Sequence, residues 1–226
     1  MAGTIGGNTL ARSREALIAA DLHLEVRKLR TWLGETGASV DGYPAWWAID
    51  GVIGALDDFV THTPPDAWTA QNVEDLLCVL EHSTTDYAVE LATRTEPMAL
   101  AIARHALAQR SVAGDDIAAR LGHCLRHREE AESLLMAFVQ DPHERTRRMA
   151  LLSLAQMRSA AVPALAAAAW NSGDEYQRIG ALAALRLVDS GLLPEYVARA
   201  LEDGRPHLLA NARKHAEDAA RPSESA

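Results

Sequence analysis

The chain has few of the residues that build disulfide-rich, metal-bound or β-sheet proteins. It has only two cysteines, Cys78 and Cys124, in 226 residues, too few for a disulfide framework or a zinc finger. Both lie in apolar helical patterns, so we expect small buried thiols. Aromatic residues make up 5% of the chain, and no segment alternates with the period of two that marks a half-buried strand. An all-helical fold is therefore expected.

Long apolar runs, a signal-peptide pattern and surplus positive charge are also missing. No stretch approaches the run of about 18 uncharged apolar residues that a membrane span needs. The N-terminus lacks a basic segment followed by an apolar one. The formal net charge is −9, which disfavours nucleic acid as a partner, because phosphates require surplus Lys and Arg. We expect a cytoplasmic protein that binds no membrane and no nucleic acid.

Apolar residues recur at helical spacing almost throughout, and the connections are short enough to make consecutive helices antiparallel. Asp66 is the expected N-cap of the third helix. We expect a flexible N-terminus over 1–8, a single helical-repeat domain over 9–220 and a disordered tail over 221–226. The predicted helices cover residues 9–33, 45–60, 68–82, 84–93, 96–109, 114–127, 129–140, 143–157, 161–171, 174–188, 191–202 and 205–219.

The second half of the sequence repeats with a period of 31 residues. The segments 141–154 and 172–185 align at this offset. The offset pairs Arg147 with Arg178, Ala150 with Ala181, Leu154 with Leu185, and Pro163 with Pro194. A further step reaches Ala212 and Ala216, with Leu209 in place of the arginine, as expected of a terminal copy. The period predicts stacked helix pairs.

The segment Asp141-Pro142-x-x-x-x-Arg147-x-x-Ala150-x-x-x-Leu154 resembles the second helix of a HEAT repeat. The resemblance covers about 129–218 well, 84–128 loosely and 1–83 poorly. It implies an all-α, right-handed α-solenoid of antiparallel helix pairs, with divergent acidic helices over 9–83 and HEAT-like repeats over 84–220. We expect Asp141 to cap free N–H groups, and Arg147 to bind loop carbonyls or the adjacent repeat's Asp.

Lysine and arginine are absent from residues 31–93, which nevertheless contain eleven acids and four of the five tryptophans. This window carries a net charge of −11, whereas the remaining 163 residues carry +2. A field of one sign steers a partner of opposite charge, and tryptophans anchor interfaces. The predicted partner-binding residues are Trp46, Trp47, Asp50, Asp57, Asp58, Asp66, Glu74 and Asp75.

These features predict a non-enzymatic protein-binding module, with no catalytic, cofactor or metal site. The sharpest hypothesis is an immunity or antitoxin-type inhibitor that neutralises a basic partner, such as a cognate nuclease-like toxin. A general HEAT-repeat scaffold or adaptor is the alternative. The solenoid fold supports binding by analogy with other repeat proteins rather than through any residue of this chain.

Two further hypotheses, a metal site and a DNA glycosylase, have less support from the sequence. His123 and His127 would share a face of the helix predicted over 114–127 and, with His105 or Glu130, could ligate a metal. Some HEAT-like proteins are DNA glycosylases that use aromatics and an Asp in a basic groove, but the acidic window offers no Lys or Arg for such a groove. A small basic cluster lies elsewhere, at Arg145, Arg147 and Arg148.

Overall fold

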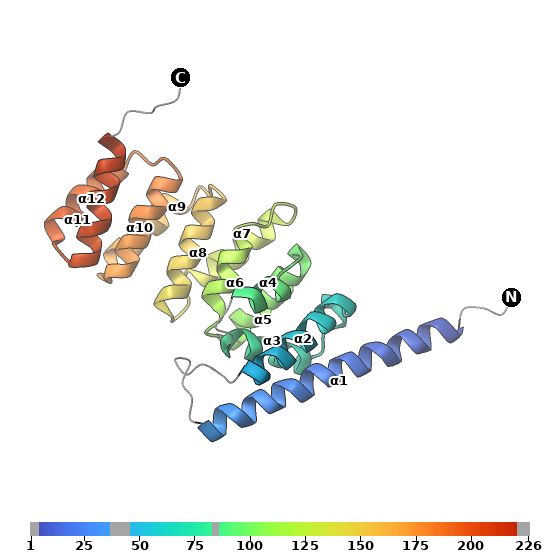
Figure 1. Cartoon of the computed structure of the whole chain (residues 1–226). Helices are drawn as coiled ribbons and strands as arrows, with labels where there is room; N and C mark the ends of the chain where they lie inside the picture. Colours follow the sequence, from blue (N-terminus) through green and yellow to red (C-terminus); the bar gives the residue numbers. More distant parts are fainter. Residues whose placement is uncertain (1–4, 37–45, 83–85, 221–226) are drawn as a thin grey trace. The chain divides into compact units, whose positions relative to one another are not determined.

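The structure, a computed structural model, describes residues 5–36, 46–82 and 86–220. Within these ranges the chain forms twelve α-helices, one 3₁₀ helix and no strand, so the all-α prediction is confirmed. The elements are α1 (Ile5–Thr36), α2 (Trp46–His62), η1 (Pro65–Ala67), α3 (Ala70–His82), α4 (Asp86–Ala92), α5 (Glu96–Gln109), α6 (Gly114–Leu121), α7 (Arg128–Phe138), α8 (Glu144–Gln156), α9 (Val162–Asn171), α10 (Glu175–Leu187), α11 (Leu193–Asp203) and α12 (Pro206–Ala220) (Figure 1).

The chain divides into two compact units, Met1–Ala113 (unit 1) and Gly114–Ala226 (unit 2). The single domain expected over 9–220 stays a prediction. Of the N-terminus expected to be flexible, residues 1–4 lie outside the described residues and residues 5–8 belong to α1. The tail over 221–226 also lies outside them. Gly6 and Gly7 are both part of α1, because a glycine costs a helix only about 1 kcal/mol.

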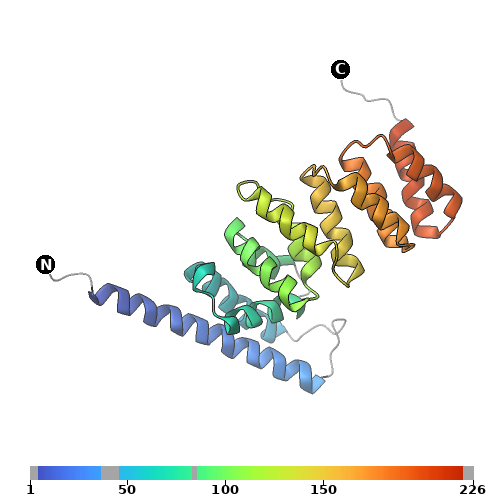
Figure 2. The same ribbon diagram turned by 180° about the vertical axis from the view of Figure 1, so that it is seen from behind.

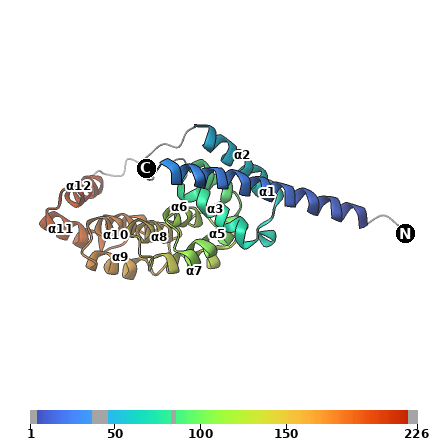
Figure 3. The ribbon, with the colours of Figure 1, turned by 90° about the horizontal axis from the view of Figure 1, so that it is seen from below.

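Unit 1 is organised around the long helix α1, which packs against α2 and α3 (Figure 3). Leu22, Val26 and Leu29 are buried, and their spacing of four and three residues places them on one face of the helix. Helix α2 buries apolar side chains as well, including Leu56 and Phe59. Burial of this shared apolar surface holds the three helices together.

The start of α3 corrects the prediction that Asp66 caps the third helix. Asp66 lies in η1, and α3 begins only at Ala70. Thr69 precedes the helix, and its hydroxyl accepts the backbone N–H of Asn72 at 3.2 Å. The Asn72 side chain in turn accepts the backbone N–H of Thr69 at 3.0 Å. This reciprocal pair satisfies two donors at the helix start, so no cap is needed at Asp66.

Unit 2 is a stack of antiparallel helix pairs. In Figure 1 and Figure 2 its helices follow one another in chain order. One row is formed by α6, α8, α10 and α12, each in contact with the next, while α7, α9 and α11 each pack on the helix that follows them. Two of the buried alanines on the facing surfaces are Ala150 and Ala181, whose small side chains let the helices approach closely. This is the α-solenoid arrangement that the period of 31 residues predicts.

The backbone of unit 2 repeats with the same period. Gly173 and Gly204 both have positive φ, 79° and 74°. Arg158 and Asp189 also share a left-handed conformation, each with a φ of 52°, and Arg158 donates two hydrogen bonds of 3.1 Å to Asp189. The turns that end α8 and α10 therefore have one geometry, and a side-chain contact joins them.

The same helix-ending turn is also present in unit 1. Arg110, after α5, has a φ of 53°. The hydroxyl of the next residue, Ser111, accepts the backbone N–H of Ala113 at 3.3 Å, as the hydroxyl of Ser159 does for Ala161 in unit 2. A local signature of the repeats is thus present before residue 114, in a region where the sequence resembles a HEAT repeat only loosely.

The predicted roles of the repeated arginines are confirmed. Arg147 Nη1 donates to the loop carbonyls of Asp141 and Pro142, at 2.9 and 2.7 Å. Arg178, one repeat later, donates to the carbonyl of Trp170 at 3.0 Å and forms an ion pair with Asp203. The carboxylate of Asp141 accepts the backbone N–H of His143, which precedes α8, at 2.8 Å.

Candidate functional site

Four of the predicted partner-binding acids lie exposed on unit 1. Asp50 and Asp58 belong to α2, Asp66 to η1 and Glu74 to α3. Their carboxylates form no ion pair with any residue that the structure describes. Arg30 partly offsets the charge of Glu74, because its guanidinium lies near this residue and donates to its backbone carbonyl at 3.4 Å.

Asp75 is a correction to the predicted surface. Its side chain is 0% exposed and lies between α3 and α1. Oδ2 lies 2.8 Å from Nδ1 of His23, while Oδ1 lies 3.4 Å from Nη2 of Arg30 and accepts Nε2 of Gln71 at 3.2 Å. A buried carboxylate requires such partners. Asp75 thus fixes α3 to α1 and is unavailable to another protein.

Asp57 is half-exposed and forms an ion pair with Arg94. The same guanidinium donates to Thr61 Oγ1 at 3.0 Å, one turn further along α2. Arg94 lies just beyond the window that contains no Lys or Arg. The sequence does not show that Arg94 neutralises Asp57, because the two residues are 37 positions apart and no period relates them.

Of the four tryptophans of the acidic window, Trp32 and Trp68 have side chains that the structure describes. Trp68 packs on Phe59 with ring centroids 6.2 Å apart, and its Nε1 donates to the carbonyl of Thr63 at 3.0 Å. Trp32 is half-buried on α1. Trp46 and Trp47 begin α2, but their side chains lie outside the described part of the structure. Their role as interface anchors stays a prediction.

His123 and His127, the two histidines of the hypothetical metal site, do not share a helix, so the prediction that they lie on one helix face is wrong. Helix α6 ends at Leu121, and His127 lies just before α7. At Gly122, which follows α6, a side-chain carbon would come within 3.0 Å of the Ser153 Cβ on α8. The close approach of the chain at this glycine accompanies the early end of α6. Within the described ranges, no three His, Cys, Asp or Glu side chains gather as metal ligands would.

The arginines of the basic cluster are engaged within unit 2. Arg145 pairs with Asp115. Arg148 donates to Glu144 at 3.0 Å and lies over the ring of Tyr176, 5.4 Å from its centroid. Arg147 is held by the loop carbonyls described above. The nearby acids thus oppose the charge that a DNA groove would need.

Both cysteines are buried, as expected. Cys78 borders a cleft of about 490 Å³ between α1, α3 and α5 that His82 also lines. Its Sγ lies 4.0 Å from Nδ1 of His82, and hydrogen bonding with Cys78 raises the pKa of this histidine, although burial opposes the shift. Because Nδ1 donates to the Cys78 carbonyl at 2.9 Å, it cannot take the thiol proton.

None of the described helices combines the length and the apolar character that spanning a bilayer requires. No curated protein and no solved structure matches the chain. The family model described as HEAT repeats matches residues 116–186, from α6 to α10. The match begins upstream of the segment in which the sequence most resembles the family. HEAT repeats suggest a protein-interaction scaffold. Residues 116–186, which lie in unit 2, therefore carry HEAT repeats.

Proposed function

We propose that the protein is a protein-binding module whose unit 1 attracts a basic partner protein. The observation that carries this proposal is the set of exposed carboxylates at Asp50, Asp58, Asp66 and Glu74, none of which is paired with a described residue. Such carboxylates raise the local concentration of a cationic protein and speed its association. Asp57 and Asp75 are left out of the proposed interface because Arg94, His23 and Arg30 already engage them.

The sharper form of the proposal is an immunity-type inhibitor that covers the cationic surface of a nuclease-like toxin. The supporting arguments are the acidic window and the absence of a recognised catalytic motif in the sequence. A scaffold or adaptor is the alternative, and it differs in consequence: an inhibitor abolishes its partner's activity at one-to-one stoichiometry, whereas a scaffold leaves that activity intact.

Affinity capture from the host lysate, at low and at moderate salt, tests the proposal. The bait is the wild-type chain or the variant D50K/D58K/E74K. We expect the wild type to retain a basic protein stoichiometrically, less of it at moderate salt, and the variant to lose it. An activity assay of the captured protein then separates an inhibitor from a scaffold. Equal capture by both baits would overturn the proposed surface.

A further inference from the structure

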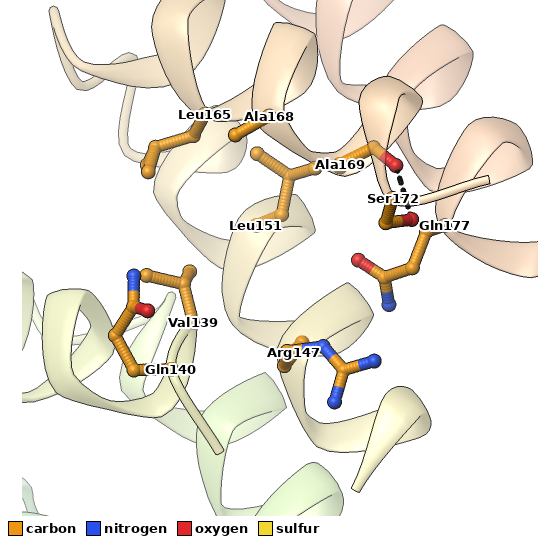
Figure 4. A pocket seen from close by; sticks show the side chains of 9 residues that line it. All are labelled: Val139, Gln140, Arg147, Leu151, Leu165, Ala168, Ala169, Ser172 and Gln177. Carbon is orange, nitrogen blue, oxygen red and sulfur yellow. Dashed lines mark hydrogen bonds between the residues drawn. The ribbon is translucent and has the colours of Figure 1, made fainter. Parts of the chain in front are cut away.

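Unit 2 contains a pocket at the junction between two helix pairs. It has a volume of about 200 Å³ and is formed by the end of α7 and by residues of α8, α9 and α10. Figure 4 shows the apolar side chains of Val139 and Leu165 towards one side, and the polar side chains of Arg147, Ser172 and Gln177 towards the other. The pocket thus joins a mainly apolar wall, where Gln140 also lies next to Val139, to a cationic wall, whose one charged side chain is Arg147.

The cationic wall has hydrogen-bonding capacity to spare. Arg147 uses Nη1 for two loop carbonyls, while its Nε and Nη2 donate to no group within the described residues. The guanidinium also forms no ion pair with the described residues. The hydroxyl of Ser172 donates to the carbonyl of Ala169 at 2.7 Å. An arginine with open donors beside an apolar wall fits a carboxylate joined to an apolar group.

The next junction of the same protein contains such groups. At the offset of 31 residues, the positions of Val139, Leu165 and Ser172 are taken by Trp170, Tyr196 and Asp203. Trp170 and Tyr196 are buried and pack edge to face, with ring centroids 5.1 Å apart. Arg178, the counterpart of Arg147, lies 5.0 Å from the centroid of Trp170 and pairs with Asp203.

The two junctions therefore share an arginine but differ in what surrounds it. In the second junction the chain itself supplies two aromatic rings and a carboxylate. In the first, smaller residues stand at all three positions, and a pocket is present. We propose that this pocket binds a segment of a partner protein in which an aromatic side chain lies next to a carboxylate. The aromatic ring would lie against Val139 and Leu165, and the carboxylate would accept from Arg147.

This inference concerns unit 2 and does not rest on the acidic surface of unit 1. Two peptides test it: acetyl-Gly-Trp-Asp-Gly-amide, and the same peptide with Asn in place of Asp. Each is titrated into the full-length ¹⁵N-labelled protein and followed by its amide and arginine side-chain signals. We expect the Asp peptide to shift signals of α8, of α9 and of the Arg147 side chain. The Asn peptide should bind about tenfold more weakly or worse, because it lacks the charge-assisted hydrogen bond.

Variants of the protein separate the pocket from its surroundings. V139W/S172D places the groups of the second junction in the first, so it should abolish peptide binding without lowering the melting temperature. Ser133→Asp on the exposed side of α7 adds the same charge outside the pocket and should leave binding unchanged. Arg147→Gln keeps a donor for the loop carbonyls but removes the charge, so it should weaken binding of the Asp peptide alone.

Several results would overturn the proposal. These are equal affinity for the two peptides, no binding of either at millimolar concentration, and shifts confined to unit 1. A free aromatic acid, indole-3-propionate, is the remaining probe. If it binds in the pocket and the Asp peptide does not, the pocket takes a small molecule and the proposed protein segment is wrong. If V139W/S172D does not fold, the comparison of the two peptides on the wild type still decides.

Discussion

The two units hold their helices together with polar contacts of different kinds. In unit 2 the contacts between repeats span sequence separations of 25 to 33 residues. Gln177 donates to the carbonyl of Glu144, 33 residues away, at 2.9 Å, and Glu175 accepts the backbone N–H of His207, 32 residues away, at 3.0 Å. In unit 1, Ser111 donates to Glu81, 30 residues away, at 2.6 Å, but other contacts have no such spacing, as between His23 and Asp75, 52 residues apart. Because unit 2 repeats, its contacts can be predicted from the sequence. The contacts of unit 1 depend on individual residue pairs.

The largest expected effect comes from the two phenylalanines of the chain, one in each unit. Phe59 and Phe138 are both 0% exposed. Replacing either with Ala removes a buried ring, which typically lowers the free energy of unfolding by about 3–5 kcal/mol. Amide hydrogen exchange should show F59A speeding exchange in unit 1 and F138A in unit 2. Loss of protection across the whole chain in both variants would mean that the units unfold as one.

Asp75→Asn tests the polar contact on which unit 1 depends. The amide cannot accept both His23 and Arg30 as the carboxylate does, and the site is fully buried. We expect a loss of about 2 kcal/mol, because both partners are partly exposed and can be hydrated again. Urea unfolding measures it, with Asp58→Asn on the exposed side of α2 as the control. Equal stability of the two variants would show that the pair does not hold α1 to α3.

Asp203→Asn tests the corresponding contact in unit 2 and adds a pH dependence. Hydrogen bonds from Arg205, and to a lesser extent the charges of Arg205 and Arg178, lower the pKa of Asp203 from 3.8 to about 2, although burial opposes the shift. Because the folded pKa is lower than the unfolded one, the stabilisation is present above pH 3.8 and is lost as the pH falls towards 2. The variant should lose about 1–2 kcal/mol at pH 7.

Unfolding curves at several pH values check this prediction. The gap between wild type and D203N should stay constant from pH 7 to pH 5 and then close between pH 4 and about pH 2. A gap that persists unchanged near pH 2 would assign the effect to packing instead of to the ionised carboxylate. Glu202→Gln, an exposed neighbour on α11, serves as the matched control.

The smallest expected effect concerns the turn that both units share. Arg110 and Arg158 each have a left-handed backbone conformation that costs a non-glycine residue free energy. Arg110→Gly should therefore raise the stability by up to about 1 kcal/mol. Arg158→Gly should gain less, because it also loses the exposed ion pair with Asp189. Thermal melts would contradict the shared-turn geometry if both variants were clearly destabilised.

The predictability of the fold follows the same division. The period linking Arg147 to Arg178 predicted the helix pairs of unit 2 and the contacts of both arginines, because one repeat supplies the pattern for the next. The end of α6 was missed, since the approach of α8 to Gly122 is not visible in helical periodicity. The junction pocket was missed although its signal was present: the aligned repeats show Ser172 opposite Asp203 and Val139 opposite Trp170.

Part of the candidate site could be predicted, because exposed acids follow from a local absence of Lys and Arg. The burial of Asp75 could not, since its partners His23 and Arg30 come from a helix more than 40 residues earlier. Composition gives the charge of a segment. It does not tell which charges the fold neutralises.

The central claim is that unit 1, through its exposed acids, attracts a basic partner. Two variants with the same change in net charge test it against the captured partner. D50K/D58K/E74K reverses acids of unit 1, and E129K/E202K/E217K reverses exposed acids of unit 2. The measurement is the partner's dissociation constant at low salt for both variants and the wild type. We predict about tenfold weaker binding or more for the unit 1 variant, and little change for the unit 2 variant. Equal weakening by both would contradict the account, because attraction would then depend on net charge and not on this surface.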